Sequence, residues 1–355
     1  MSSILLAQNN NTIEKAKQQL NKWLISLNID TQNISDYSKK YLTRYKTEHV
    51  LYINHYANLL KHAVSQTNKS ITELTVLDYG GGIGIMSHLL SLAGAKAIVY
   101  NDIFETSTND TKTLAEKNGI RIDHFITGDI TETINYLEFN KLNVDLIISM
   151  DVLEHIYSLN NWFSELAKIK QSYVLFFNTG ANPKNPLIKH RITKIQKIAE
   201  FKGQNVNEGW KERDSKGAFI KIREGIINDL NHDFTEQEVK TLSSDTRGLI
   251  KSDIEAYALS YAQTKKRANT HPYYLSNTCD PLTGNWEEHL INLPLFITDL
   301  KKLGLNASIV NGKYSYSQNK FKNFLKRVLN IFMRCFPLFA LDFSPSYSLI
   351  IKPKT

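Results

Sequence analysis

The residues best suited to bind a small charged ligand stand between positions 78 and 84. Asp78 is followed by Gly80, Gly81, Gly82 and Gly84. Glycine lets a ligand lie directly against the backbone, and the unbonded N–H groups at the start of a helix attract its negative end. A short apolar run before this stretch and a helical apolar pattern after it predict a strand, a glycine turn and a helix.

The spacing of these glycines distinguishes two kinds of nucleotide site. A dinucleotide fingerprint, G-x-G-x-x-G, needs its third glycine at position 85, which is Ile85. The chain instead has an aspartate and then glycines at alternate positions, from Asp78 to Gly84. This pattern resembles the first motif of class I S-adenosylmethionine-dependent methyltransferases. The glycines alone are also compatible with a variant NAD site or with a tight turn.

Two further aspartates end the next two predicted strands. Asp102 lies 18 residues after Gly84 and can accept hydrogen bonds from ribose hydroxyls. Asp129 is expected to hold the adenine amino group, and Asp78 to face the ammonium of the methionine part. A helix cap or a turn is the alternative for each aspartate taken singly. The predicted cofactor is S-adenosyl-L-methionine, and its expected contacts also include Ile103, Ile130, Met150 and Asp151.

A second motif follows the predicted fourth strand. The string Asp151-Val152-Leu153-Glu154-His155 resembles the corresponding motif of small-molecule methyltransferases of the ubiquinone-biosynthesis type. This resemblance covers roughly residues 40–180 and, more faintly, the last fifty.

His155 is the first candidate for a catalytic base. Methyl transfer from a sulfonium is an in-line displacement, and an oxygen acceptor of high pKa also needs a general base. The ordinary pKa of histidine suits proton acceptance near neutral pH. A histidine that caps or packs at a helix start is the alternative, and His190, His271 and His289 are rival bases.

Three parts of the chain are expected to contact the methyl acceptor. Tyr41, Arg44 and Tyr45 belong to a polar-aromatic group before the first strand, where the resembled family places helices over the cofactor and acceptor. Asn178 ends the fifth strand. Residues 277–289 suit a polar acceptor such as a sugar, with the expected contacts Asp280, Trp286 and Glu288. A well-capped turn before a helix is the equal alternative for this stretch.

The motifs argue against two substrate classes. Methyltransferases of base amino groups carry Asn or Asp, then Pro-Pro and an aromatic residue after the fourth strand, whereas this chain has the range 151–154 described above. Cytosine C5 methylation needs a nucleophilic cysteine near that strand, and Cys279 lies far from it in sequence. The two cysteines, Cys279 and Cys335, have neither metal-site nor disulfide spacing, so no metal is expected.

Strand and helix patterns alternate regularly between residues 74 and 178. Five strands are expected there, at 74–77, 97–100, 122–126, 144–150 and 173–177, and two more at 305–310 and 346–351. The alternation predicts an α/β fold with a doubly wound, mostly parallel sheet. The resemblance implies a Rossmann-like methyltransferase sheet of seven strands with the last one antiparallel.

Four segments are expected along the chain. Residues 1–70 form an N-terminal helical cap, and residues 71–180 form the cofactor-binding core. Residues 181–292 form a helical acceptor-binding insertion between strands five and six, and residues 293–355 complete the sheet with a basic amphipathic helix.

The net charge of +8 is concentrated at one end. Residues 301–355 contain eight Lys and two Arg against a single acid, Asp342. The apolar stripe of residues 321–332 is expected to pack on the sheet; weak contact of the basic face with an anionic membrane is the alternative. No nucleic acid is expected, because basic and aromatic residues interleave only in this helix.

The composition, with 42% apolar and 22% charged residues, is ordinary for a soluble protein with one main domain. A signal-peptide pattern, a long uncharged apolar stretch and a disulfide pattern are all lacking, so a cytoplasmic location is expected. The pattern does not specify an oligomeric state.

These features together predict an S-adenosylmethionine-dependent methyltransferase that acts on a small-molecule or glycan-type acceptor, at oxygen. Two alternatives remain: a catalytically inactive cofactor-binding module, and an RNA methyltransferase that uses the basic end.

Overall fold

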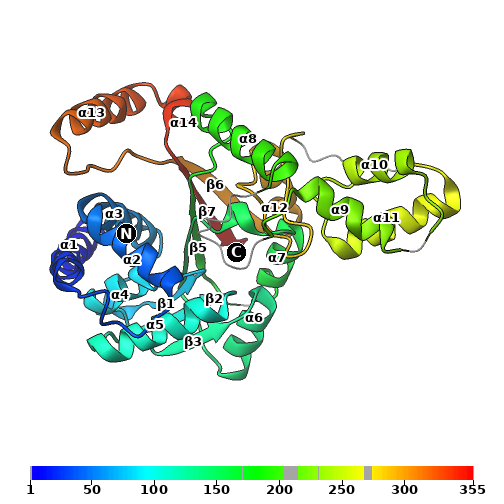
Figure 1. Cartoon of the computed structure of the whole chain (residues 1–355). Coiled ribbons are helices and arrows are strands. Elements are labelled where there is room, and N and C mark those ends of the chain that lie inside the picture. Colours follow the sequence, from blue (N-terminus) through cyan, green and yellow to red (C-terminus); the bar gives the residue numbers. More distant parts are fainter. Residues whose placement is uncertain (1, 170, 204–214, 231, 268–273, 355) are drawn as a thin grey trace. The chain divides into compact units, whose positions relative to one another are not determined.

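One sheet organises the larger part of the chain (Figure 1). The computed structural model describes residues 2–169, 171–203, 215–230, 232–267 and 274–354. Within them, seven strands form a sheet in the order β3-β2-β1-β4-β5-β7-β6. The strands are β1 (Thr75–Tyr79), β2 (Ala97–Asp102), β3 (His124–Thr127), β4 (Leu146–Met150), β5 (Val174–Thr179), β6 (Leu305–Asn311) and β7 (Tyr347–Pro353).

The pairing directions confirm the predicted fold class. Strands β1 to β5 pair in parallel, whereas β7 runs antiparallel to both β5 and β6. Parallel strands need crossover connections, and helices between them supply these. The sheet is therefore doubly wound and mostly parallel, with its last strand inserted between the fifth and the sixth.

Helices precede, connect and follow the strands. The first part of the chain has α1 (Ser3–Ser26), α2 (Asp36–Thr47), α3 (His49–Ser65), η1 (Ile71–Glu73), α4 (Ile85–Leu92), α5 (Glu105–Asn118), α6 (Ile130–Phe139), η2 (Leu153–His155) and α7 (Leu159–Leu166). The later part has α8 (Pro186–Phe201), α9 (Phe219–Asn228), α10 (Glu236–Asp245), α11 (Lys251–Thr264), α12 (Leu293–Lys302), α13 (Lys320–Cys335), η3 (Pro337–Phe339) and α14 (Ala340–Phe343).

The chain divides into two compact units. The sheet unit comprises Met1–Leu153, Asn160–Gly180 and Ile297–Thr355, and the insertion unit comprises Glu154–Leu159 and Ala181–Phe296. The insertion between β5 and β6 is helical, as predicted. The functional division into cap, core, acceptor-binding insertion and completing segment stays a prediction.

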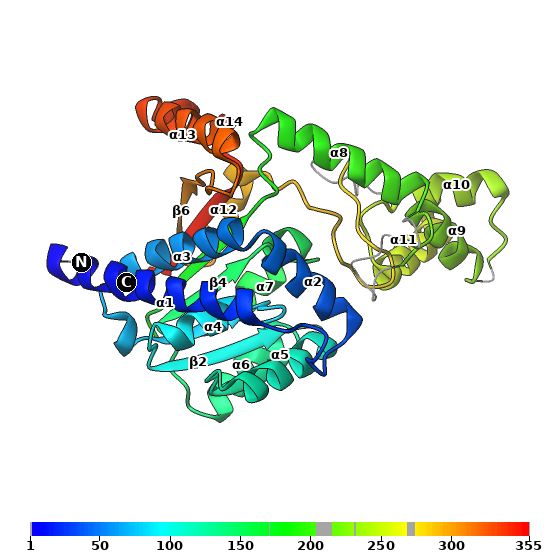
Figure 2. The ribbon, with the colours of Figure 1, turned by 60° about the vertical axis from the view of Figure 1, so that its left-hand side comes forward.

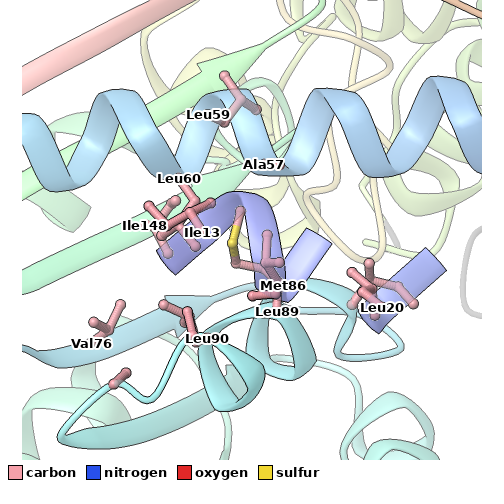
Figure 3. Packing of buried hydrophobic residues seen from close by; sticks show 14 of the residues in the cluster. Ile13, Leu20, Ala57, Leu59, Leu60, Val76, Met86, Leu89, Leu90 and Ile148 are labelled. Atoms are coloured by element: carbon pink, nitrogen blue, oxygen red, sulfur yellow. The ribbon is translucent and has the colours of Figure 1, made fainter. Parts of the chain in front are cut away.

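The core of the sheet unit lies between the central strands and helices α1, α3 and α4. Along α1, the buried residues recur every three or four positions, which gives the helix one apolar face; they include Ile13, Ala16, Leu20 and Leu24. Figure 3 shows Leu60 of α3 together with Ile13 and with Ile148 of β4. Burying a side chain of this size contributes about 1.5–3 kcal/mol. This core holds β1 and α4, the two elements on either side of the glycine turn.

The insertion unit has a separate apolar core and a buried ion pair. Helices α9, α10 and α11 pack around Ile227, Leu242 and Ile254. Arg223 of α9 is fully buried and pairs with Glu200 of α8, which is also buried. Its Nε donates to the carbonyl of Ser243 in α10 at 2.7 Å. The guanidinium therefore joins three helices of this unit.

The sequence predicts a polar helix near residues 111–117, but helix α5 begins earlier. It starts at Glu105, and the residues that its first turns bury are polar, among them Ser107, Thr108 and Asp110. Asp110 accepts a hydrogen bond from the backbone N–H of Ser35 at 3.1 Å. An apolar period does not reveal a helix whose buried face is polar, which explains the missed start.

Helix α13 corrects a second expectation. Its apolar stripe was expected to pack on the sheet, but within this fully described helix Met333 alone is buried. Figures 1 and 2 both show α13 (orange) apart from the strands of the sheet unit. The segment before the helix accounts for this arrangement, because it binds the polar side of α13 and leaves the apolar side outward.

Among the described residues, helices that are both long enough and apolar enough to cross a bilayer are lacking.

Candidate active site

The glycine turn joins β1 to α4 and is held by hydrogen bonds from three directions. The N–H of Gly82 donates to Asp102 at 2.9 Å, and the carbonyl of Gly82 accepts from the hydroxyls of Tyr100 at 2.5 Å and Thr111 at 2.7 Å. Gly82 has a φ of +55°, a left-handed conformation that favours glycine. A Cβ atom built on Gly82 meets nothing within 4 Å, so the backbone here faces open space.

Gly84 is required for a different reason. It has a φ of +75° and begins α4, and a Cβ atom there would lie 2.5 Å from the Cγ2 of Thr111 in α5. Gly84 therefore lets α4 and α5 approach each other, whereas Gly82 leaves room for something outside the fold. The predicted glycine turn therefore allows close packing of α4 on α5 and leaves open space beside its backbone.

Asp78 is buried near the end of β1 and is bonded to the first turn of α4. Its Oδ2 accepts hydrogen bonds from the N–H of Ser87 at 3.0 Å and from the Ser87 hydroxyl at 2.6 Å. Burial raises the pKa of Asp78 to about 6, against the lowering effect of these two hydrogen bonds. The carboxylate is thus poised to respond to a cation placed near it.

Asp102 brings the end of β2 to the glycine turn. Its Oδ2 accepts from Gly82, as described above, and its Oδ1 accepts from the N–H of Phe104 at 2.8 Å. The structure therefore brings together Asp78, the four glycines and Asp102 at the carboxyl ends of β1 and β2. Ile103, directly after Asp102, is 59% exposed.

Asp129 is exposed after β3 and caps α6. Its Oδ1 accepts from the N–H of Thr131 at 2.6 Å, and its own N–H donates to Glu132 at 2.9 Å, which makes a capping box. The cap that was the alternative interpretation of this residue is thus present. Ile130, the next residue, is buried in the first turn of the helix.

The ends of β4 and β5 are bonded to each other around Asp151. Met150 ends β4, and the exposed Asp151 after it has a φ of +52°, which is uncommon for a residue other than glycine. Its N–H donates to the carbonyl of Asn178 at 2.8 Å, and its Oδ1 accepts from Gly180 at 3.1 Å. Strained backbone of this kind often occurs at functional sites.

Tyrosines of α2 and α3 form a connected aromatic group. Tyr45 lies at ring-centroid distances of 6.2 Å from Tyr41, 4.8 Å from Tyr52 and 6.2 Å from Tyr56. The guanidinium of Arg44 lies 5.4 Å from the Tyr52 ring. Burial raises the pKa values of Tyr45, Tyr52 and Tyr56, and the charge of Asp151 adds to each increase. These tyrosines and Asp151 therefore share one electrostatic neighbourhood in the sheet unit.

His55 is a further histidine near the end of β5 that sequence reasoning missed. It lies on α3, near the hydroxyl of Ser315 at 3.4 Å. Burial lowers its pKa to about 4, opposed by a hydrogen bond with the Asn178 side chain. The amide of Asn178 also donates to the hydroxyl of Ser348 at 3.0 Å. His55 stands four positions from both Leu51 and Leu59, and this helical spacing was the signal that it lies on an inward face.

The remaining predicted site residues belong to the insertion unit and form a compact turn. His155 Nδ1 lies 2.8 Å from the carbonyl oxygen of Trp286, whose ring stacks on His289 at 4.3 Å. The carboxylate of Asp280 is buried and accepts from the N–H groups of Ser215 at 2.6 Å and Leu282 at 2.8 Å. These hydrogen bonds correspond to the turn that was the alternative interpretation of residues 277–289.

Glu288 and the rival histidines complete the predicted residues of this unit. Glu288 has a φ of +56° and its carbonyl accepts from Gln196 at 3.0 Å. Of the rival bases, His190 is exposed on α8, and burial lowers the pKa of His289 to about 4. His271 lies outside the described residues. The described part of the chain has no group of three or more metal-ligating side chains.

A family comparison agrees with the geometry of the glycine turn. Residues 72–243 match the model of a family described as a methyltransferase domain. The match covers just under half of the chain, and this part is similar to a methyltransferase domain. The match begins just before β1, and it includes the glycine turn, Asp102, Asp129 and Asp151. The cofactor of this methyltransferase family is S-adenosylmethionine, as predicted.

Solved structures resemble the chain at low sequence identity. A methyltransferase from Clostridium acetobutylicum has a TM-score of 0.44 and 13% identity, covering 89% of this chain and 98% of that chain. The magnesium protoporphyrin IX methyltransferase of Synechocystis, with bound S-adenosylhomocysteine, has a TM-score of 0.36 and 13% identity, covering 96% and 100%. The YcgJ protein of Bacillus subtilis has a TM-score of 0.32 and 16% identity, covering 40% of this chain and 59% of that chain.

No curated protein sequence matches the chain significantly.

Proposed function

We propose that the sheet unit binds S-adenosyl-L-methionine over the glycine turn and transfers its methyl group to an oxygen atom of a small-molecule or glycan-type acceptor. The observation that carries this proposal is Gly82. Its backbone is held by Asp102, Tyr100 and Thr111, yet the space that a side chain would fill is open. A fixed backbone beside open space suits close contact with a ligand.

The acidic residues around the turn fit the chemical groups of the cofactor. Asp102 would accept hydrogen bonds from the ribose hydroxyls, and Asp78 would face the ammonium group. Asp129 would accept from the adenine amino group. The other proposed contacts are Gly80, Gly81, Gly84, Ile103, Ile130, Met150 and Asp151. When bound, the cofactor supplies an electrophilic methyl group on a sulfonium.

The acceptor is proposed to lie near the ends of β4 and β5 in the sheet unit. Tyr41, Arg44, Tyr45 and Asn178 are its proposed contacts there. The electrostatic neighbourhood shared by Tyr45, Tyr56 and Asp151 supports this choice, because it combines aromatic surface with a carboxylate. Holding the acceptor oxygen in line with the methyl group would supply most of the rate enhancement.

His155 is the proposed general base. The carbonyl of Trp286 can only accept, so the proton of a neutral His155 ring lies on Nδ1. That tautomer leaves the basic lone pair on Nε2. His155→Gln should therefore lower kcat. His190→Gln, on the exposed surface of α8, is the matched control and should leave kcat unchanged.

Calorimetry tests the cofactor proposal. We expect binding of S-adenosylmethionine and S-adenosylhomocysteine and no binding of NAD. Asp102→Ala should weaken binding by about 1–3 kcal/mol, because ribose hydroxyls would lose their acceptor. Asp123→Ala is the control, since Asp123 lies just before β3, at the amino ends of the strands. It accepts a hydrogen bond from the backbone N–H of Ile98 at 2.8 Å. Preference for NAD, or equal losses in the two variants, would overturn the proposal.

We propose that Asp280, Trp286 and Glu288 of the insertion unit bind the acceptor. Single replacements should leave cofactor affinity unchanged while they abolish turnover, followed as S-adenosylhomocysteine release over a panel of hydroxylated small molecules and glycans. The hydrogen bonds of Asp280 make loss of stability the competing outcome. Equal losses of melting temperature and turnover would assign these residues to the turn alone.

A further inference from the structure

The polar side of helix α13 is hydrogen-bonded to the segment before it. Asn323 exchanges two hydrogen bonds with the backbone of Ser317, at 2.8 and 2.7 Å. Asn330 does the same with the backbone of Tyr314, at 2.9 Å for both bonds. Between them, Lys326 donates to the carbonyl of Ser315 at 2.7 Å. Residues 323, 326 and 330 share one helix face, so this face is fixed inward.

The opposite side of α13 is apolar and exposed. We call it the outer face, and its members recur at helical spacing: Phe321, Phe324, Leu325, Val328 and Ile331. Phe321 is 72% exposed, and every member of the outer face exposes nearly half of its surface or more. Exposed apolar residues continue past the helix with Phe336, Leu338 and Phe339, of which Leu338 is 91% exposed. Continuous apolar surface of this kind marks a contact site.

Basic residues flank the outer face on both sides. Lys320, Arg327 and Arg334 recur every seven residues and align along one edge, while Lys322 lies beyond the other edge. All four are exposed, and none forms an ion pair with a described residue. The helix itself contains no acidic residue. The surface therefore combines a central apolar stripe with positive borders.

This arrangement distinguishes a lipid surface from a nucleic acid. An RNA-binding face places basic groups centrally, where they reach phosphates, with aromatic residues interleaved for stacking. A helix that lies in a bilayer interface has its apolar side at the centre and basic residues at the borders, near anionic headgroups. The order of residues across α13 matches that of a helix that lies in a bilayer interface.

We infer that α13 docks the protein on an anionic lipid bilayer, with the outer face in the boundary between headgroups and acyl chains. Lys320, Lys322, Arg327 and Arg334 would contact lipid phosphates. The inference uses the exposure and charge of α13, and it holds independently of the proposed methyl acceptor.

Fluorescence at Cys335 tests this inference directly. Cys335 is exposed at the end of α13, whereas Cys279 is buried in the insertion unit, so a polarity-sensitive thiol label attaches selectively to the helix. Vesicles of phosphatidylglycerol and phosphatidylcholine should shift the emission of the labelled full-length chain to the blue. Vesicles of phosphatidylcholine alone should leave it unchanged. A shift that is equal for both vesicle types, or absent from both, would overturn the inference.

Variants separate the apolar from the electrostatic part. Phe321→Ser with Phe324→Ser should reduce co-sedimentation with anionic vesicles by about tenfold or more, because apolar burial anchors the helix. Lys320→Gln with Lys322→Gln and Arg327→Gln should reduce it similarly at about 0.05 M salt, but not at about 0.5 M, where charges are screened. Phe139→Ser is the matched control, since Phe139 is 87% exposed on α6.

Two further measurements would contradict the inference. Gel filtration that shows dimers dissociated by the Phe321 and Phe324 changes, without vesicle binding, would assign the outer face to a second copy. Salt-sensitive RNA binding that is lost with the basic residues, again without vesicle binding, would assign the helix to nucleic acid. Circular dichroism should show that every variant keeps the secondary-structure content of the unchanged protein.

Discussion

Gly82 combines a backbone held from both sides with open space where a side chain would stand. Replacing the carboxylates around it tests ligand binding less cleanly. Asp78 and Asp102 also accept hydrogen bonds that stabilise the folded protein. A small change at Gly82 therefore tests ligand binding with little disturbance of packing.

Gly82→Ala should lower the free energy of unfolding by about 1–2 kcal/mol, which is the cost of placing an L-residue in a left-handed conformation. It should also reduce cofactor affinity about tenfold or more, because the new methyl group fills the ligand space. Gly119→Ala is a matched control. Gly119 has a φ of +64° and equally open surroundings, but it ends α5 at the far end of that helix. Melting temperatures should fall alike in both variants, and calorimetry should show lost affinity in Gly82→Ala only. Equal affinities would contradict this prediction.

The titration of Asp78 should make both stability and cofactor affinity depend on pH. Burial raises its pKa to about 6 from an ordinary value of 3.8, so the folded protein holds an extra proton between about pH 4 and 6. Its contribution to the free energy of unfolding is full below about pH 4 and is lost as the pH rises through about 6. A ligand ammonium favours the carboxylate, so cofactor affinity should rise with pH over this window.

Asp78→Asn should bind the cofactor more weakly and remove that rise, because the amide does not titrate in this range. Calorimetry of both proteins from about pH 5 to 7.5 measures the difference. An affinity of the unchanged protein that is flat over this range would show that Asp78 does not face the ammonium.

At the scale of elements, the buried pair of Arg223 and Glu200 joins α8, α9 and α10. Arg223→Met leaves the Glu200 carboxylate buried, with Thr278 donating at 2.7 Å and Arg247, 3.9 Å away, as its remaining cation. The loss should be about 3–5 kcal/mol, seen as faster hydrogen exchange across these helices. Adding Glu200→Leu should restore part of it, because the buried carboxylate that has lost Arg223 disappears.

Lys240→Met provides the exposed counterpart. Lys240 pairs with Glu236 at 2.7 Å on the surface of α10, where water and salt weaken the interaction. Hydrogen exchange in α10 should not change measurably. Comparable losses of protection against hydrogen exchange in Arg223→Met and Lys240→Met would contradict the view that burial makes the Arg223 ion pair the stronger one.

Individual elements also show how far sequence patterns reach. The apolar period of residues 321–332 correctly indicated an amphipathic helix, but periodicity does not say which side of a helix the rest of the chain covers. Asn323 and Asn330, seven residues apart, decide this through hydrogen bonds to a segment without regular structure. The start of α5 was missed because its buried side chains are polar.

At the scale of the whole molecule, the sheet and the glycine turn were predictable, because buried parallel strands and glycine spacing have local signatures. The antiparallel last strand came from the family resemblance. The meeting of Asp102 with Gly82 followed from topology, since parallel strands end at one edge. The neighbourhood of Asp151, His55 and the tyrosines depends on tertiary contacts between α3 and the ends of β4 and β5, and no local pattern encodes these.

The insertion of β7 between β5 and β6 also sets an order of events during synthesis. β6 pairs with β7 in the sheet, and thirty-five residues separate the two strands, with α13 among them. A chain emerging from the ribosome therefore shows unpaired edges of β5 and β6, together with the apolar side of α13, until β7 arrives. Unpaired strand edges and exposed apolar surface are the features that promote aggregation. The interval between the synthesis of β5 and that of β7 is thus when this protein most needs a chaperone or a nearby bilayer to shelter it.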